Sequence, residues 1–111
     1  MKGSGTEGGS TKSQRSEIQG RMMNFLDLDS DGLRRVVLES MVQSQEFTVL
    51  SLHEEVSKEV NVSRKVVASM TGYIGSRLGI LHMNKKSYRT PRTYALKDEY
   101  ADIARAVLAS L

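Results

Sequence analysis

Cysteine and tryptophan are absent from this chain of 111 residues, which also has only one proline and two histidines. Without cysteine the protein can form no disulfide, thiol nucleophile or thiolate-bound zinc site, and two histidines offer few nitrogen ligands to a metal. No apolar run approaches the roughly 18 residues that span a membrane, and the N-terminus lacks the apolar core of a secretory signal. We therefore expect a cytoplasmic protein that needs no cofactor.

Acidic residues are absent from one long segment. Residues 60–97 hold eight Lys and Arg and no Asp or Glu, whereas residues 27–59 hold eight acidic residues and three basic ones. The formal net charge of +3 conceals this separation. A solvated surface usually mixes both signs, so a block of one sign is a candidate contact surface for a polyanion. The basic block is the strongest functional signal in the sequence.

The stretch DLDSDG, Asp27 to Gly32, looks like the first half of a calcium-binding loop. Such a loop needs a bidentate Glu at its twelfth position, where this chain has Leu38. The alternative is that the carboxylates precede a helix N-terminus, where partial positive charge favours them. We favour this interpretation, with Ser30 or Asp31 as the cap of a helix that begins near Leu33.

Helical spacing of apolar residues accounts for most of the chain. The first sixteen residues are mostly Gly, Ser and Thr, and we expect them to form a disordered tail. Ser16 and Gln19 then predict a capping box that opens a helix with an apolar face of Ile18, Met22, Phe25 and Leu26. Further helices are predicted over residues 33–44, over 52–60 after a capping box of Ser51 and Glu54, over 63–78 and over 98–111. EFTVL, residues 46–50, is prone to β-structure, and residues 80–96 are typical of a β-hairpin.

The turn VNVS, residues 60–63, separates two of these helices. Asn61 tolerates the left-handed backbone that a tight reversal requires, and Ser63 is expected to cap the next helix. In that helix Val67, Met70, Ile74 and Leu78 recur at three and four residues, which predicts a buried face. Gly79 is expected to end the helix.

Two helices joined by a tight turn and followed by a basic hairpin resemble a winged helix-turn-helix DNA-binding domain over Leu33–Leu96. In this resemblance residues 52–78 are the helix-turn-helix and residues 80–96 are the wing. The segments FTVLSLHEEV, VASMTGYIGSRLGIL and TYALKDEY are also similar to a small archaeal winged-helix family of unassigned function. The implied fold class is mostly α with a small β-hairpin (α+β), in a single winged-helix domain over residues 17–111.

The resemblance implies binding to double-stranded DNA, with helix 63–78 in the major groove and the wing on the backbone or in the minor groove. A rotation of about 100° per residue places Lys65, Ser69, Gly72 and Ser76 opposite the apolar face. Cations there can reach phosphates, and hydroxyls can donate hydrogen bonds. The predicted DNA-binding residues are Ser63, Arg64, Lys65, Ser69, Tyr73, Arg77, Lys85, Lys86, Arg89 and Arg92. We expect a transcriptional regulator.

Three further questions concern partners and catalysis. The apolar stripes of Ile18–Leu26 and Tyr100–Leu111 either build a homodimer or both cover the core of one chain. Alternatively the fold serves as a protein-interaction module, in which Tyr73, Tyr88 and the two terminal apolar stripes contact a protein, or the acidic segment 27–59 does so instead. An enzyme is not expected, because neither histidine has a partner at metal-ligand spacing and no Ser sits in a nucleophile elbow.

Overall fold

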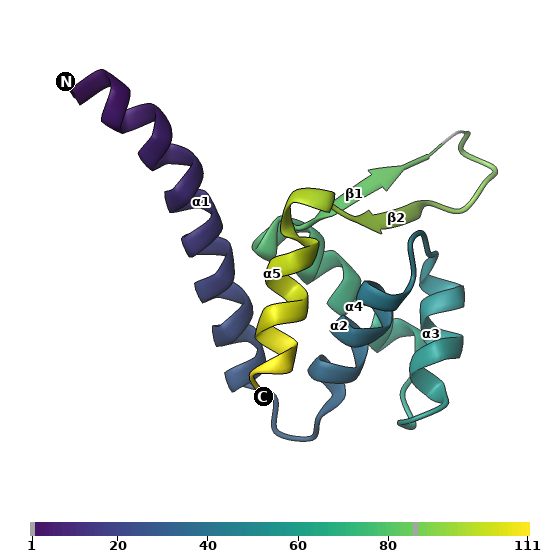
Figure 1. The fold of residues 1–111 in the computed structure, drawn as a ribbon. Helices are drawn as coiled ribbons and strands as arrows, with labels where there is room; N and C mark the ends of the chain where they lie inside the picture. Colours follow the sequence, from purple (N-terminus) through teal and green to yellow (C-terminus); the bar gives the residue numbers. More distant parts are fainter. Residues whose placement is uncertain (1, 86) are drawn as a thin grey trace.

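The fold is mostly helical, with one small antiparallel hairpin near the C-terminus (Figure 1). The computed structural model describes residues 2–85 and 87–111, with side chains from Gln14 onward. The helices are α1 (Lys2–Asp27), α2 (Leu33–Gln43), α3 (Val49–Ser57), α4 (Arg64–Tyr73) and α5 (Asp98–Ala109). A π-helical turn, η1 (Ile74–Leu78), extends α4, and strands β1 (Leu81–Asn84) and β2 (Thr93–Leu96) form the hairpin. This confirms the prediction of a helical chain with a small hairpin.

Helix α1 passes through the point where the folded part is predicted to begin. Ser16 lies inside α1, so the predicted capping box of Ser16 and Gln19 is wrong. Most of the predicted disordered tail, residues 1–16, falls outside the residues whose side chains are described. Arg15 is described: its Nη2 lies 2.7 Å from Asp102 Oδ2, and its Nη1 donates to the carbonyl of Glu99. These contacts tie α1 to α5.

The carboxylates of DLDSDG cap helix α2. The two oxygens of Asp29 accept hydrogen bonds from the backbone N–H groups of Arg34 at 3.0 Å and Arg35 at 3.1 Å, and Asp31 Oδ1 accepts from Leu33 N–H at 3.1 Å. These amides have no acceptor within the first turn of the helix, so the carboxylates satisfy them. The capping interpretation is confirmed. The residue at the N-cap position itself is Gly32, with φ of 83°, and not Ser30 or Asp31.

Helix α3 begins earlier than predicted because its cap lies three residues upstream. Ser51 N–H donates to Thr48 Oγ1 at 3.0 Å, and Thr48 N–H donates to Ser51 Oγ at 2.9 Å. The capping box predicted from Ser51 and Glu54 is therefore wrong. The predicted inward face is correct, since Leu52 and Val56 are buried.

The turn between α3 and α4 differs from the prediction in one respect. Ser63 caps α4 as predicted, with its Oγ accepting from Val66 N–H at 3.2 Å. Asn61 is not left-handed, because among the described residues positive φ occurs only at glycines. Instead the Val62 carbonyl lies 2.8 Å from His53 Nε2, which links the turn back to α3.

The predicted helix 63–78 is regular only as far as Tyr73. Residues 74–78 widen into η1, and Gly79 then ends the helix as predicted, with φ of 69° and its N–H bonded to the Ile74 carbonyl at 3.1 Å. The hairpin follows directly, pairing Leu81 with Leu96 and Asn84 with Thr93. On the other edge of β2, Tyr94 forms an isolated bridge with Phe47, through hydrogen bonds of 2.8 and 2.7 Å. The β-prone EFTVL segment thus contributes a single bridge.

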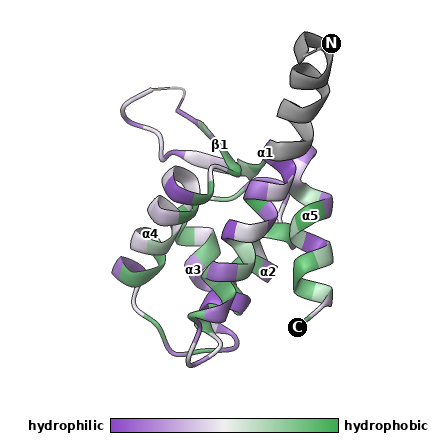
Figure 2. Cartoon of the chain, turned by 90° about the vertical axis from the view of Figure 1, so that its left-hand side faces the viewer, coloured by the Kyte–Doolittle hydropathy of each residue, from purple (hydrophilic) through white to green (hydrophobic). Residues whose placement is uncertain are grey.

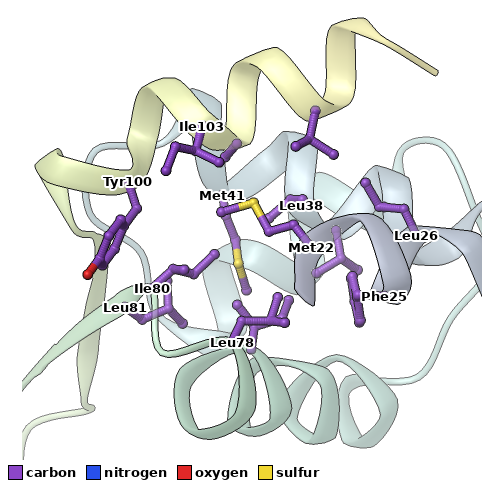
Figure 3. Close-up of a cluster of buried hydrophobic side chains, with 14 of the residues drawn as sticks. Met22, Phe25, Leu26, Leu38, Met41, Leu78, Ile80, Leu81, Tyr100 and Ile103 are labelled. Atoms are coloured by element: carbon purple, nitrogen blue, oxygen red, sulfur yellow. The ribbon is translucent and has the colours of Figure 1, made fainter. Parts of the chain in front are cut away.

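All of the described helices contribute to one apolar core. Figure 3 shows Met22 and Phe25 of α1, Leu38 and Met41 of α2 and Ile103 of α5 around the same cluster. All five side chains are buried. Full burial of such a side chain stabilises a fold by about 1.5–3 kcal/mol. None of the helices in the described part of the chain combines the length and apolar character required of a membrane-crossing helix.

The apolar stripes of α1 and α5 belong to this core. Ile18, Met22, Phe25 and Leu26 of α1 are buried, and so are Tyr100, Ile103, Ala104 and Val107 of α5. A homodimer through these helices stays a prediction, and its apolar surface would have to come from exposed neighbours such as Met23 and Leu111.

Candidate nucleic-acid interface

Helix α4 presents a face of small and basic side chains to solvent. Lys65, Ser69, Gly72 and Ser76 are exposed, and so are the neighbouring Arg64, Ala68 and Tyr73. The opposite side packs on the core, because Val67, Thr71, Ile74 and Leu78 are buried and Met70 is half-buried. The helix orientation predicted from apolar spacing is therefore confirmed. Small residues at Ser69 and Gly72 leave room for a second molecule to approach the helix backbone.

The described cations of the basic block, residues 60–97, have no acidic partners among the described residues. The ion pairs of the described residues join Arg15 to Asp102, Arg21 to Glu17, Arg35 to Glu39 and Lys58 to Glu55. None of these pairs involves a cation of residues 60–97. The unpaired cations in the basic block are Arg64, Lys65, Arg77, Lys85, Arg89, Arg92 and Lys97. Lys86 lies outside the described residues. The positive charge of this region is thus available to an outside anion.

The hairpin and α4 project from the same side of the molecule, at the left of Figure 2. Lys85, Arg89 and Arg92 are exposed on the connection between β1 and β2. The tip is held by a tight turn, in which Thr90 N–H donates to the Ser87 carbonyl and Ser87 N–H donates to Thr90 Oγ1, both at 3.2 Å. This turn presents Tyr88, whose relative exposure of 84% is the highest of any large apolar or aromatic residue described.

A groove of about 410 Å³ runs along one side of α4. From α4 it is lined by Lys65, Val66, Ser69, Met70 and Tyr73, and from the end of α1 and the start of α2 by Phe25 and Arg34. The Tyr73 ring stacks on Phe25, with centroids 5.7 Å apart and an interplanar angle of 21°. The groove thus combines an apolar wall with cations and a hydroxyl.

The structure brings some of the predicted site residues together and separates others. Lys65, Ser69 and Tyr73 line the groove. Arg77 lies apart from it on η1, where its carbonyl accepts from Arg21 Nη1 at 3.4 Å. Ser63 has a structural task as the cap of α4, although its hydroxyl hydrogen is free to donate.

Arg34 is the residue that sequence reasoning missed. Its guanidinium carbon lies 4.7 Å above the centre of the Phe25 ring, and its Nη1 donates to the Phe25 carbonyl at 3.1 Å. Charge counting assigns Arg34 to the acidic segment, and helical spacing does not indicate that it lines a groove together with α4. No sequence signal marks it, because its place depends on how α1, α2 and α4 pack.

Two ionisable groups elsewhere on the surface have shifted pKa values. The Arg15 hydrogen bond lowers the pKa of Asp102, and the Glu55 hydrogen bond raises the pKa of Lys58. Both reflect surface ion pairs. Within the described part of the chain no three His, Asp or Glu side chains gather at a distance suited to a metal.

Comparison with known sequences defines the family. Residues 22–104 match the DUF2551 family, which is described as a protein of unknown function. An uncharacterized protein of Archaeoglobus fulgidus is 34% identical over 93 residues, which cover 83% of this chain and 93% of that protein. The chain therefore belongs to the DUF2551 family, and the predicted similarity to an archaeal family of unassigned function is confirmed. No solved structure matches the chain significantly.

Proposed function

We propose that this protein is a winged helix-turn-helix protein that binds double-stranded DNA through α4 and the hairpin, and that it serves as a transcriptional regulator. Helix α4 enters the major groove, and the hairpin contacts the backbone or the adjacent minor groove. The observation that carries the proposal is that α4 and the hairpin, which project from the same side of the molecule (Figure 2), carry cations that form no ion pair with the described acidic residues.

The order of elements supports the winged-helix assignment. Helix α2, the bridge at Phe47, helices α3 and α4, and the β1–β2 hairpin follow one another as the helices and strands of a winged-helix domain do. Helices α1 and α5 are then additions that complete the core. A fold alone does not decide a function, so the charge of the surface has to carry the rest.

The electrostatics support a polyanion as the partner. Six of the predicted contact residues are cations described without an ion pair: Arg64, Lys65, Arg77, Lys85, Arg89 and Arg92. If each neutralises one phosphate, the logarithm of affinity should fall with the logarithm of salt concentration at a slope of roughly −5.4. Doubling the salt would then weaken binding roughly 40-fold.

The experiment is a titration of a labelled random duplex of about 25 base pairs, followed by fluorescence anisotropy at 50, 100 and 200 mM salt. The test variant carries Arg64→Ala and Lys65→Ala together. Loss of two phosphate contacts should weaken binding roughly 60-fold at 0.1 M salt and make the slope less steep by about 1.8. A pool of random duplexes then distinguishes general binding from the sequence-specific binding of a regulator, since only the latter enriches a common site.

The matched control carries Arg35→Ala and Lys58→Ala. It removes the same charge, but from residues already paired with Glu39 and Glu55. Its affinity should stay within about twofold of the unmodified protein, because long-range charge effects are screened within roughly 10 Å at this salt concentration. If both double variants lost duplex affinity by the same factor, the effect would come from net charge in general, and the proposed interface would be refuted. Absence of salt-dependent duplex binding would refute the DNA proposal and leave the protein-interaction alternative.

A further inference from the structure

The groove along α4 has the composition of a phosphate-binding site. Its lining residues include the cations Arg34 and Lys65 and the hydroxyl of Ser69, and no carboxylate. The remaining walls come from Val66, Met70 and the stacked rings of Tyr73 and Phe25, which are apolar. A deoxyribose with its phosphate complements these surfaces, because its sugar carbons can pack on the apolar wall and its anionic phosphate can contact the cations.

Arg34 is held in place before any ligand arrives. Its backbone N–H is bonded to Asp29 at 3.0 Å, and its guanidinium lies over the Phe25 ring and donates to the Phe25 carbonyl. A guanidinium has five N–H donors, so the others are available to a phosphate. Because the side chain is already ordered, binding would cost it little further rotamer entropy.

The neighbouring Arg35 shows the opposite arrangement. Its Nη1 donates to both carboxylate oxygens of Glu39, at 3.1 and 3.2 Å, so its charge is paired within α2. Arg34 makes no ion pair with any described acidic residue. The adjacent residues Arg34 and Arg35 therefore differ: the charge of Arg35 is paired with Glu39, whereas the charge of Arg34 is available to a bound anion.

We propose that Arg34, with Lys65 and Ser69, binds a backbone phosphate of the DNA that α4 reads, so that the nucleic-acid surface extends from α4 onto the start of α2. This inference rests on the proposed function. It adds a contact from outside the helix-turn-helix and the hairpin. The apolar wall at Val66, Met70 and Tyr73 would take the sugar attached to that phosphate.

The experiment compares Arg34→Gln with Arg35→Gln in the same duplex titration, with circular dichroism to verify folding. Glutamine keeps most of the aliphatic stem but removes the charge, together with the guanidinium that lies over the Phe25 ring. Loss of one phosphate contact should weaken binding about eightfold at 0.1 M salt and about fourfold at 0.2 M, with a slope less steep by about 0.9. Arg35→Gln should change affinity by less than twofold. Arg34→Lys should preserve the slope, since the charge remains.

Lys65→Ala separates this inference from the proposed function. If Lys65→Ala weakens duplex binding about eightfold and Arg34→Gln does not, the extension onto α2 is wrong while the DNA proposal stands. If neither substitution has an effect and the unmodified protein shows no salt-dependent duplex binding, the proposed function fails as well; if that binding is present, only the extension onto α2 is refuted. If Arg34→Gln changes affinity by the same factor at every salt concentration, Arg34 acts through structure and the phosphate contact is refuted.

A last titration identifies the source of the phosphate. A free mononucleotide such as dAMP carries the same chemistry and should not compete with the duplex at 1 mM, because it offers one phosphate without the rest of the interface. Displacement of the duplex by dAMP in the unmodified protein, lost in Arg34→Gln, would make the groove a nucleotide site and overturn the inference.

Discussion

Replacing Asp29 by alanine should destabilise the protein through the start of α2. The carboxylate accepts from two backbone amides, Arg34 N–H at 3.0 Å and Arg35 N–H at 3.1 Å, and alanine would leave both without a protein acceptor. Loss of a capping side chain costs about 1 kcal/mol and up to about 2. Because one carboxylate here serves two amides, we expect about 2 kcal/mol. An unfolding entropy of about 2.1 cal/mol/K per residue gives roughly 0.23 kcal/mol/K for 111 residues, and therefore a fall in Tm of about 9 °C.

Differential scanning calorimetry at pH 7 measures this fall. The matched control is Asp27→Ala, because Asp27 is exposed and forms no ion pair or side-chain hydrogen bond among the described residues. It should lower Tm by no more than about 2 °C, as expected of a surface substitution. Adding 1 mM calcium should leave the Tm of the unmodified protein unchanged. A fall of less than 2 °C in Asp29→Ala, or a rise of Tm with calcium, would refute the capping role.

Three further predictions test other parts of the fold. Gly79→Ala should lower the unfolding free energy by about 1 kcal/mol, because alanine is strained at a φ of 69°. The cost should be limited to this backbone strain, since the added Cβ would meet no neighbouring atom within 4 Å. Gly72→Ala, at an exposed position inside α4, should instead raise the unfolding free energy by up to about 1 kcal/mol; equal effects in thermal melts would contradict this reasoning. Met22→Ala, at a fully buried side chain of α1, should cost about 2–5 kcal/mol in urea unfolding, and a loss below 1 kcal/mol would show that α1 is dispensable. Arg15→Ala should make the loss of stability on acidification shallower. Arg15 lowers the pKa of Asp102 from its ordinary value of 3.8, so the contribution is complete above that value and is lost as the pH falls through the folded-state pKa. Identical urea midpoints of both proteins from pH 5 to pH 2.5 would contradict it.

Much of the fold could be predicted from sequence because local spacing decides it. The apolar residues of α4 and η1 recur at three and four positions, and the core buries Val67, Ile74 and Leu78 and partly buries Met70. Gly79 lies at the left-handed position that its sequence context predicted. The errors concern choices between neighbouring polar residues. Thr48 and Glu54 lie three residues on either side of Ser51, and in the structure Thr48 caps the start of α3, directly after the bridge between Phe47 and Tyr94 of β2.

The candidate site could be predicted only in its helical part. Exposure of Lys65 and Ser69 follows from a rotation of about 100° per residue, and the structure has both exposed. The groove could not be predicted, because it forms where α4 meets the end of α1 and the start of α2, at Phe25 and Arg34, more than thirty residues before Lys65 in the sequence. Nothing in the composition of residues 25–34 indicates that Phe25 stacks with Tyr73.

Charge counting along a sequence treats every cation alike, but what makes a cation available to DNA is the absence of an acid within reach. Much of that absence is local. Arg21 pairs with Glu17, Arg35 with Glu39 and Lys58 with Glu55, at separations of three or four residues within helices. When the cations with such local partners are left out of the count, Arg34 remains among the cations without an acidic partner on the same helix. The net charge of residues 27–59 nevertheless places it in an acidic segment. An arginine without a local partner, held by an aromatic ring and a carbonyl, has lost rotamer entropy with no ion pair in return. A contact with an outside anion would account for this arrangement, and that is the physical reason why Arg34 rather than Arg35 is the residue to substitute first.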